Sequence, residues 1–297
     1  MSEQNQYSSA KFGLIAGIIA YTIWGFLPVF FKLTHAVPPL EILAHRVVWA
    51  VPFGLMIILA RKQWGEVKSA FKNPHTLGYL ALAALLIALN WGIYIWAVQE
   101  DQIFQASLGY YINPLLFVLI GVVFLGEKLR KLQIFAVILA TIGVAVLTIY
   151  GGQFPWISLT LAISFTIYAL IRKKIAIGAM PGLFVETIVL LAPAFGHLIW
   201  LNTQNDLVFA HTSTSLNTLL ILAGPITVIP LVAFAFAARR LRLSTIGFLQ
   251  FIGPSLQFMT GIYYGEKLSP AYLLCFAFIW AAVILFAWDA ATRRKVV

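Results

Sequence analysis

The sequence has little charge. Of its 297 residues only 10% are Asp, Glu, Lys or Arg, whereas 61% are hydrophobic, and the mean hydropathy is +0.92. A soluble domain of this length has about 25% charged residues, so this chain cannot cover a water-exposed globule with polar groups. Surface that faces lipid needs no charge. The composition therefore excludes a soluble domain and predicts an integral membrane protein.

Cysteine is also scarce, and the signatures of several chemistries are missing. The single cysteine, Cys275, lies inside an apolar run, so no intrachain disulfide can form. The sequence contains no phosphate-binding loop of the type GxxxxGK[ST], no HExxH and no GxSxG, and its five histidines are scattered. We therefore expect no ATP hydrolysis by the chain itself, no bound metal and no cofactor.

The net charge of +10 comes from short basic clusters between the apolar runs. Proteins that bind nucleic acid gather such residues on one face or in an arm, so this placement excludes a nucleic-acid partner. The expected partners are the lipid bilayer and a small-molecule solute. Small residues four apart, as at Gly13 and Gly17, let helices pack closely within the chain or between copies, and the oligomeric state stays open.

Long apolar runs are abundant. A helix needs about 20 apolar residues to cross the hydrocarbon core of a bilayer, and ten suitable runs occur. The period-2 alternation of a membrane barrel is absent. The connections are short, so we expect the function to reside within the membrane bundle of an all-α membrane protein. The ten predicted transmembrane helices are residues 13–32, 41–60, 76–98, 103–125, 132–150, 154–171, 181–201, 216–238, 244–264 and 270–290.

Lysine and arginine orient these spans, because they are retained on the cytoplasmic side of a membrane. With the N-terminus in the cytoplasm, all of the 20 basic residues except Lys32, Arg46 and Lys267 fall on that side. An even number of spans then places the C-terminus there as well. We therefore predict a multi-pass protein with both termini in the cytoplasm.

Two segments of the chain repeat one pattern. Residues 106–129 read ASLGYYINPLLFVLIGVVFLGEKL, and residues 244–268 read STIGFLQFIGPSLQFMTGIYYGEKL. The first copy closes the fourth predicted span and the second closes the ninth, so five spans separate them and the second copy is inverted. We predict two inverted five-helix repeats, residues 1–150 and 151–297, an arrangement typical of transporters that bind solute between the repeats. The alternative is a chance likeness between segments rich in Gly, Pro and apolar residues.

Ionisable residues inside the predicted spans are few, and each is a functional candidate because charge within a bilayer is costly. In the second span Glu41, His45 and Trp49 share one face through their spacing of four, and Arg46 lies beside it. Glu186, in the seventh span, is the counterpart in the opposite leaflet. We expect Arg46 and Glu186 to be opposing polar elements on a transport path, with Glu186 a candidate proton-coupling group. The alternatives are an Arg46 that reaches outward to the interface and a purely structural Glu186.

Prolines and deep polar or aromatic side chains mark a central cavity. Pro114 and Pro254 leave the carbonyls four residues earlier without a helical partner, and such groups need a partner within protein or a wet cavity. Pro225 and Pro230 make another irregular stretch. The deep tryptophans are candidates to stack on an aromatic or cationic solute, and core packing is the alternative. Beyond the second and seventh spans, the candidate lining residues are Trp24, Asn90, Trp91, Tyr110, Tyr111, Asn113, Thr227 and Gln250.

Short stretches in a specific order carry a family resemblance. They are IWG (23–25) with FKL (31–33), EIL (41–43) with HRV (45–47), NW (90–91) with IWAV (95–98), ASLGY (106–110) with INPL (112–115), RKK (172–174), RLRLST (240–245) and FAFIW (276–280). Over nearly its whole length the chain resembles the EamA-type transporters of the drug/metabolite transporter superfamily, and within them the RarD-type proteins. The resemblance implies ten helices in two inverted halves, a bacterial inner-membrane location, alternating access and small organic solutes.

Together these observations predict a secondary transporter of small organic metabolites or drugs, with export favoured over import. One alternative is a facilitator without ion coupling. A membrane enzyme would need a convergent catalytic set, and a sensor would need a signalling domain that no loop can hold. Substrate identity, direction and coupling ion stay open at this point.

Overall fold

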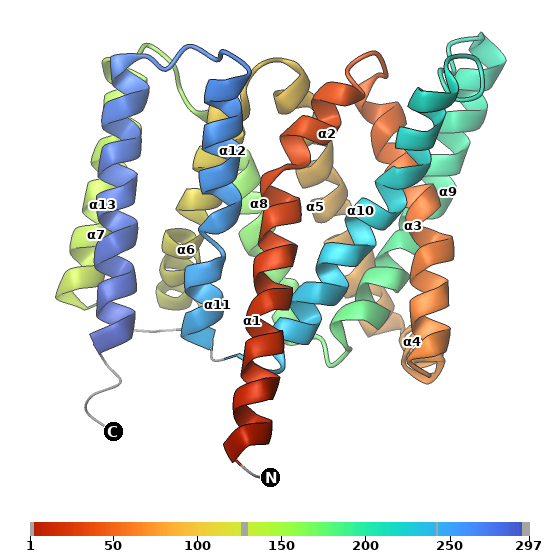
Figure 1. The fold of residues 1–297 in the computed structure, drawn as a ribbon, viewed down its shortest axis with the longest axis horizontal. Coiled ribbons are helices and arrows are strands. Elements are labelled where there is room, and N and C mark those ends of the chain that lie inside the picture. Colours follow the sequence, from red (N-terminus) through yellow and green to blue (C-terminus); the bar gives the residue numbers. More distant parts are fainter. Residues whose placement is uncertain (1–2, 126–129, 242, 293–297) are drawn as a thin grey trace.

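Helices make up all the regular structure of the described residues. The computed structural model of the protein describes residues 3–125, 130–241 and 243–292. In Figure 1 helix α1 begins and helix α13 ends at the lower edge of the bundle. The helices are α1 (Glu3–Gly25), α2 (Leu27–Leu33), α3 (Pro39–Ala60), α4 (Trp64–Lys72), α5 (Pro74–Gln99), α6 (Ile103–Leu125), α7 (Lys131–Ile149), α8 (Trp156–Lys174), α9 (Ala179–Gln204), α10 (Thr214–Ala238), α11 (Leu243–Leu249), α12 (Ile252–Tyr263) and α13 (Pro270–Thr292).

Eight stretches of the described residues are long and apolar enough to cross a membrane. They are Lys11–Leu33, which comprises most of α1 together with α2, and the helices α3, α5, α7, α8, α9, α10 and α13. The predicted all-α membrane architecture is thereby confirmed. The predicted runs 103–125 and 244–264 also form helices, namely α6 and the pair α11 and α12. The count of ten spans stays a prediction.

Proline interrupts one predicted span and is tolerated in another. The run 244–264 forms two helices rather than one, because the chain turns at Gln250 and Phe251 and α12 then starts with Pro254 in its first turn. A proline fits there, since the first N–H groups of a helix have no partner within it. Pro114, by contrast, lies inside the continuous helix α6.

A short helix that the sequence analysis did not predict connects α3 to α5. Helix α4 buries Val67 and Ala70 and lies at the lower edge of Figure 1. Its Glu66 carboxylate accepts the backbone N–H of Gly178, the residue just before α9, at 3.0 Å. A carboxylate at a helix N-terminus satisfies a free donor and opposes the helix dipole. Helix α4 therefore ties the lower ends of α3 and α9 together.

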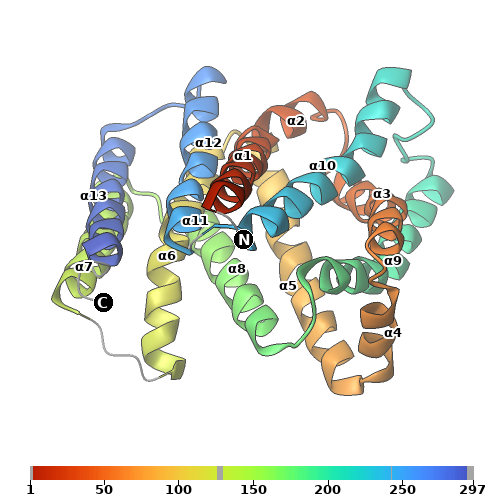
Figure 2. The ribbon, with the colours of Figure 1, turned by 60° about the horizontal axis from the view of Figure 1, so that its bottom comes forward.

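The long helices pack in two groups. Helices α7 and α13 lie side by side at one end of the molecule (Figures 1 and 2). In the other group α3 packs on α9 and α10, α5 packs on α8 and α9, and α1 packs on α10. The approach of α3 to α10 is close because position 224 is glycine: a Cβ there would overlap the backbone carbonyl of Trp49. This approach brings polar side chains of α3 and α10 into contact.

Candidate functional site

A buried arginine lies where four helices meet. Arg46 of α3 is only 5% exposed, and its Nε donates a hydrogen bond of 2.7 Å to Thr227 Oγ1 of α10. Its guanidinium lies over the ring of Trp91 of α5, 4.0 Å from the ring centroid, and 5.9 Å from that of Phe31 of α2. A cation is attracted to the face of an aromatic ring. The charge of Arg46 is therefore held by a ring and a hydroxyl.

Arg46 has no acidic partner among the described residues. The ion pairs of that part of the chain join Lys32 to Asp101, Arg130 to Asp289, Arg172 to Glu186, and His45 to Glu41 when the histidine is protonated. A buried charge is costly unless it is paired or hydrogen-bonded. The interior of this bundle therefore carries one positive charge that the described side chains do not neutralise.

Tyrosine hydroxyls border the same region. Tyr94 is buried, and its hydroxyl has no hydrogen-bond partner. Its ring lies 5.7 Å from that of Tyr110, whose hydroxyl donates to Asn90 Oδ1 at 3.4 Å. The amide nitrogen of Asn90 donates in turn to the Leu161 carbonyl of α8 at 2.9 Å. Tyr94 was not among the residues predicted from the sequence, although it follows Asn90 by one helical turn.

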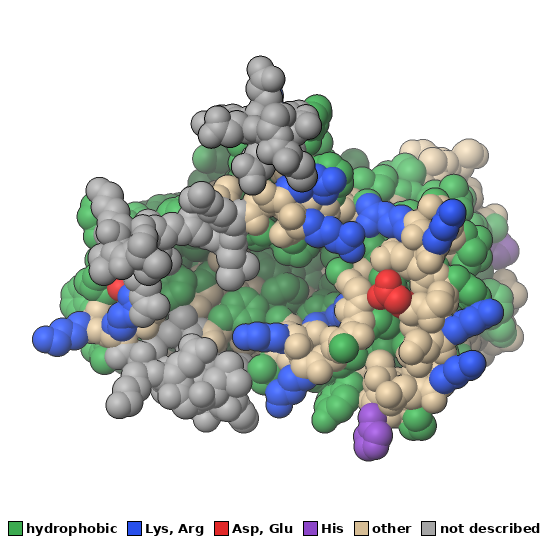
Figure 3. Space-filling view, turned by 90° about the horizontal axis from the view of Figure 1, so that it is seen from below, with side chains coloured by type: hydrophobic (Ala, Val, Ile, Leu, Met, Phe, Trp, Pro, Cys, Tyr) green, Lys and Arg blue, Asp and Glu red, His purple; other side chains and the backbone are tan. Residues whose placement is uncertain are grey.

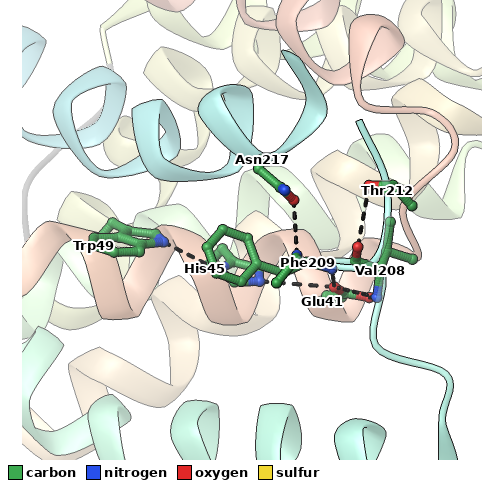
Figure 4. A network of polar contacts seen from close by, with 8 residues as sticks. Glu41, His45, Trp49, Val208, Phe209, Thr212 and Asn217 are labelled. Atoms are coloured by element: carbon green, nitrogen blue, oxygen red, sulfur yellow. Dashed lines mark hydrogen bonds and ion pairs between the residues drawn. The ribbon is translucent and has the colours of Figure 1, made fainter. Parts of the chain in front are cut away.

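Glu41, His45 and Trp49 form one chain of polar contacts along α3 (Figure 4). The Trp49 indole N–H donates to His45 Nδ1 at 3.2 Å, and His45 Nε2 lies 3.8 Å from the Glu41 carboxylate. That carboxylate also accepts the backbone N–H groups of Val208 and Phe209, each at 3.0 Å. The network therefore anchors the connection between α9 and α10 to the start of α3.

Glu186 does not contact Arg46 and has its own cation. The carboxylate is fully buried in α9, 3.4 Å from Arg172 Nε, and it accepts the Tyr168 hydroxyl at 3.2 Å. Gly182 leaves room for the guanidinium, because a Cβ there would overlap Arg172 Nη1. Arg172 was predicted to belong to the cytoplasmic basic cluster 172–174, and its contact with Glu186 was not predicted. Only the exposure of Arg172, which is lower than that of the two lysines after it, distinguishes it.

The remaining candidate residues have contacts of their own. The hydroxyls of Tyr111 and Ser255 are hydrogen-bonded at 2.7 Å, between α6 and α12. The backbone carbonyl of Trp24 accepts the side-chain N–H of Gln257 at 3.2 Å. Asn113 is buried, and its Oδ1 has no hydrogen-bond partner. Gln250 is half-buried at the turn between α11 and α12.

The second GEKL segment has a structural role. Its Glu266 carboxylate accepts the backbone N–H groups of Ile103 and Phe104, the first two residues of α6, the latter at 2.8 Å. Burial raises the pKa of Glu266 from 4.5 to about 7, against the opposing effect of these two donors. The first GEKL segment, residues 126–129, lies outside the described residues.

The raised pKa of Glu266 predicts a pH-dependent stability. Between about pH 4.5 and pH 7 the folded protein holds a proton on Glu266 that the unfolded chain has released, so its contribution to stability falls as the pH rises through this window, by at most about 3 kcal/mol. We expect Glu266→Gln to remove this contribution, which gives a flatter curve of melting temperature against pH. Asp206→Asn, at an exposed carboxylate, is the control, and an unchanged slope in Glu266→Gln would contradict the prediction.

The described residues offer no metal site. They contain no group of three or more His, Cys, Asp or Glu side chains placed to hold an ion. What the interior does contain is buried polar and aromatic side chains between apolar spans. This combination defines a multi-pass membrane protein with a polar interior.

The chain belongs to the EamA-like transporter family, and it is therefore a membrane transporter. The family matches residues 11–149. An uncharacterised transporter of Vibrio cholerae is 46% identical over 94% of this chain and 93% of its own length. Protein RarD of Salmonella typhimurium is 45% identical over 95% of this chain and 97% of its own.

More distant relatives cover similar lengths. The chloramphenicol-sensitive protein RarD of Pseudomonas aeruginosa is 32% identical over 94% of both chains. A solved crystal structure with 18% identity superposes with a TM-score of 0.60 over 92% of this chain and 96% of the other. That structure is similar in fold alone. The sequence relatives confirm the predicted family, and they are bacterial.

Proposed function

We propose that the protein is a secondary transporter that moves a small organic solute across the bacterial inner membrane by alternating access. The observation that carries this proposal is the contact of Arg46 with Thr227 at 2.7 Å. It joins α3 of residues 1–150 to α10 of residues 151–297, so a buried polar site lies between the two halves. Inverted-repeat transporters bind their solutes at such an interface.

The packing of the helices supports two five-helix repeats, and the odd number of spans in each would make the second one inverted. Numbering the spans in chain order pairs the α1–α2 segment with α8, α3 with α9, α5 with α10, α6 with the α11–α12 segment, and α7 with α13. Under this exchange the contact of α1 with α10 becomes that of α8 with α5, and the contact of α3 with α10 becomes that of α9 with α5. The contact of α1 with α12 becomes that of α8 with α6. The contacts α3–α9, α6–α12 and α7–α13 map onto themselves, as a two-fold relation requires.

The inverted arrangement predicts the labelling of two exposed lysines. Lys131, at the start of α7, follows the first GEKL segment by two residues. Lys267, between α12 and α13, is the lysine of the second GEKL segment. In a variant whose buried Cys275 is replaced by alanine, we expect Lys267→Cys to react with an impermeant maleimide in intact cells. Lys131→Cys should react only after the membrane is permeabilised. Reaction of both from the same side would contradict inverted repeats and cytoplasmic termini.

Flux in proteoliposomes tests transport itself. We expect the purified protein to move solutes from a panel of small metabolites and drugs without converting them, and outward movement from cells would establish export. Chemical conversion without flux would instead identify an enzyme. An imposed pH gradient should drive flux if the transporter is proton-coupled.

Glu186 is the residue that we propose for coupling, because it is a buried carboxylate near the lower end of α9 with a hydroxyl and a guanidinium beside it. Glu186→Gln should retain solute exchange but lose the response to the pH gradient. The matched control is Glu66→Gln, which changes a carboxylate that binds a helix end. A full pH response in Glu186→Gln would favour a different coupling group, whereas flux of the wild type that ignores the pH gradient would favour a facilitator.

A further inference from the structure

We infer that the transported solute is an organic anion whose carboxylate binds Arg46, with an apolar or aromatic body against the surrounding rings. This inference rests on the proposed transport function and names its substrate class. It starts from the unneutralised charge of Arg46, which is buried among α2, α3, α5 and α10.

The guanidinium has unused hydrogen-bond donors. Of its five N–H groups, only that on Nε has a partner among the described residues, Thr227 Oγ1. Thr227 donates its own hydroxyl proton to the Ala223 carbonyl at 2.8 Å, so its oxygen accepts from Arg46 without competition. The terminal nitrogens of Arg46 are not among the fully enclosed polar atoms, unlike the Tyr94 hydroxyl. The terminal nitrogens therefore have no acceptor among the described residues, and they suit a ligand with two acceptor oxygens.

The geometry favours an anion over a cation. The face of Trp91 is already covered by the guanidinium, 4.0 Å from the ring centroid. A cationic solute would meet both a like charge and an occupied ring, which argues against the cationic option raised by the deep tryptophans. Because Nε is bonded to Thr227, the two terminal nitrogens of the guanidinium remain for the two oxygens of a carboxylate, which arginine binds in a bidentate manner.

A second unpartnered group lies near the same charge. Tyr94 and Tyr110 are close enough to Arg46 to interact with it electrostatically. The Tyr94 hydroxyl is buried without a partner, and its ring also lies 5.9 Å from that of Phe31. A carboxylate at Arg46 would provide an acceptor for this hydroxyl. The rings of Phe31, Tyr94 and Tyr110 would then surround an apolar body.

The lower ends of α3 and α10 are also positively charged. Arg61, Arg239 and Arg240 line a cavity of about 310 Å³ there. Figure 3 shows basic side chains around a hollow on this lower face. The cavity lies about 22 Å along α3 from Arg46, at 1.5 Å per residue. Clustered basic residues concentrate anions near them, although retention of basic residues in the cytoplasm also explains this cluster, so Arg46 remains the decisive residue.

Matched ligands test the charge preference. The probes are 3-phenylpropionate, hexanoate and benzoate, each compared with its neutral amide and with the corresponding amine. Binding is measured as the thermal shift of the purified full-length protein, and movement as flux in proteoliposomes. We expect the wild-type protein to bind at least one carboxylate roughly tenfold or more tightly than its amide, as hydrogen bonds to a charged group predict.

Variants at Arg46 identify the group responsible. Arg46→Gln should abolish the preference for the carboxylate, and Arg46→Lys should restore only part of it because an ammonium lacks the bidentate edge. Arg46→Gln should melt no lower than the wild type, since it removes a buried unpaired charge. Lys68→Gln, on the exposed side of α4, is the control and should keep the preference.

The outcomes separate this inference from the proposed function. Carboxylate binding that depends on Arg46 without any flux would contradict transport and leave the ligand class standing. Flux of neutral or cationic solutes that is unaffected by Arg46→Gln would overturn the ligand class and leave transport standing. Absence of any carboxylate preference in the wild type, or its persistence in Arg46→Gln, would also overturn the inference.

Discussion

Alanine in place of Gly224 is expected to lower the melting temperature of the protein markedly. The added Cβ would overlap the carbonyl carbon and oxygen of Trp49, which are backbone atoms of α3 and cannot turn aside as a side chain can. Helices α3 and α10 must then separate, and overpacking of this kind costs about 1–3 kcal/mol, occasionally more. Thermal unfolding in detergent, followed by size-exclusion fluorescence or intrinsic tryptophan emission, measures the loss.

The same change should also weaken the candidate site. Thr227 is three residues after Gly224 on α10, so separation of the helices lengthens its 2.7 Å contact with Arg46. Gly196→Ala is the matched control, because this glycine of α9 has open space at its Cβ position. There alanine should be neutral or stabilising by up to about 1 kcal/mol through its higher helix propensity. Equal melting temperatures for the two variants would rule out a close approach of α3 and α10 at Gly224.

Among variants that remove one side-chain charge, we expect the loss of Arg172 to lower the stability of the protein the most. Arg172→Met leaves the fully buried carboxylate of Glu186 with only the Tyr168 hydroxyl as a partner. Breaking a buried ion pair from one side typically costs about 3–5 kcal/mol. We expect low yield and a strongly reduced melting temperature, measured in the same detergent as the wild type.

The double variant Arg172→Met/Glu186→Gln tests the cause. Because it removes both charges, it should be more stable than Arg172→Met alone, with a coupling energy of about 0.5–3 kcal/mol. Lys173→Met is the control, since Lys173 is exposed and has no contact with Glu186. It should change stability by no more than about 0.5 kcal/mol. Additive effects of the two single changes would show that Arg172 and Glu186 are not a functional ion pair.

The length of the apolar runs located the helices well but not their interruptions. Ten apolar runs were predicted, and each of them corresponds to a helix or to a pair of helices in the described residues. Three features were missed: the break at Phe26 between α1 and α2, the turn at Gln250 and Phe251, and the short helix α4. A run of apolar residues looks the same whether it forms one helix or two, and α4 is half polar, so hydropathy alone does not reveal these features.

The candidate residues were chosen by residue type and depth, and such a choice cannot pair them. Arg46 and Glu186 were selected because charge is rare in a membrane span. Their actual neighbours, Thr227 and Trp91 for the first and Arg172 for the second, come from other helices. Arg172 was hidden among cytoplasmic basic residues, because the rule that orients a span counts lysines and arginines without regard to where each side chain points.

Composition, run length and short ordered stretches determined by themselves that this chain is an all-helical membrane protein of the EamA-like transporter family. These properties are local, since each depends on residues within about one span of one another. Only the tertiary structure decided which buried charge is neutralised and which is not. That outcome depends on how closely helices distant in sequence approach, and a glycine such as Gly224 sets this approach through the side chain that it lacks.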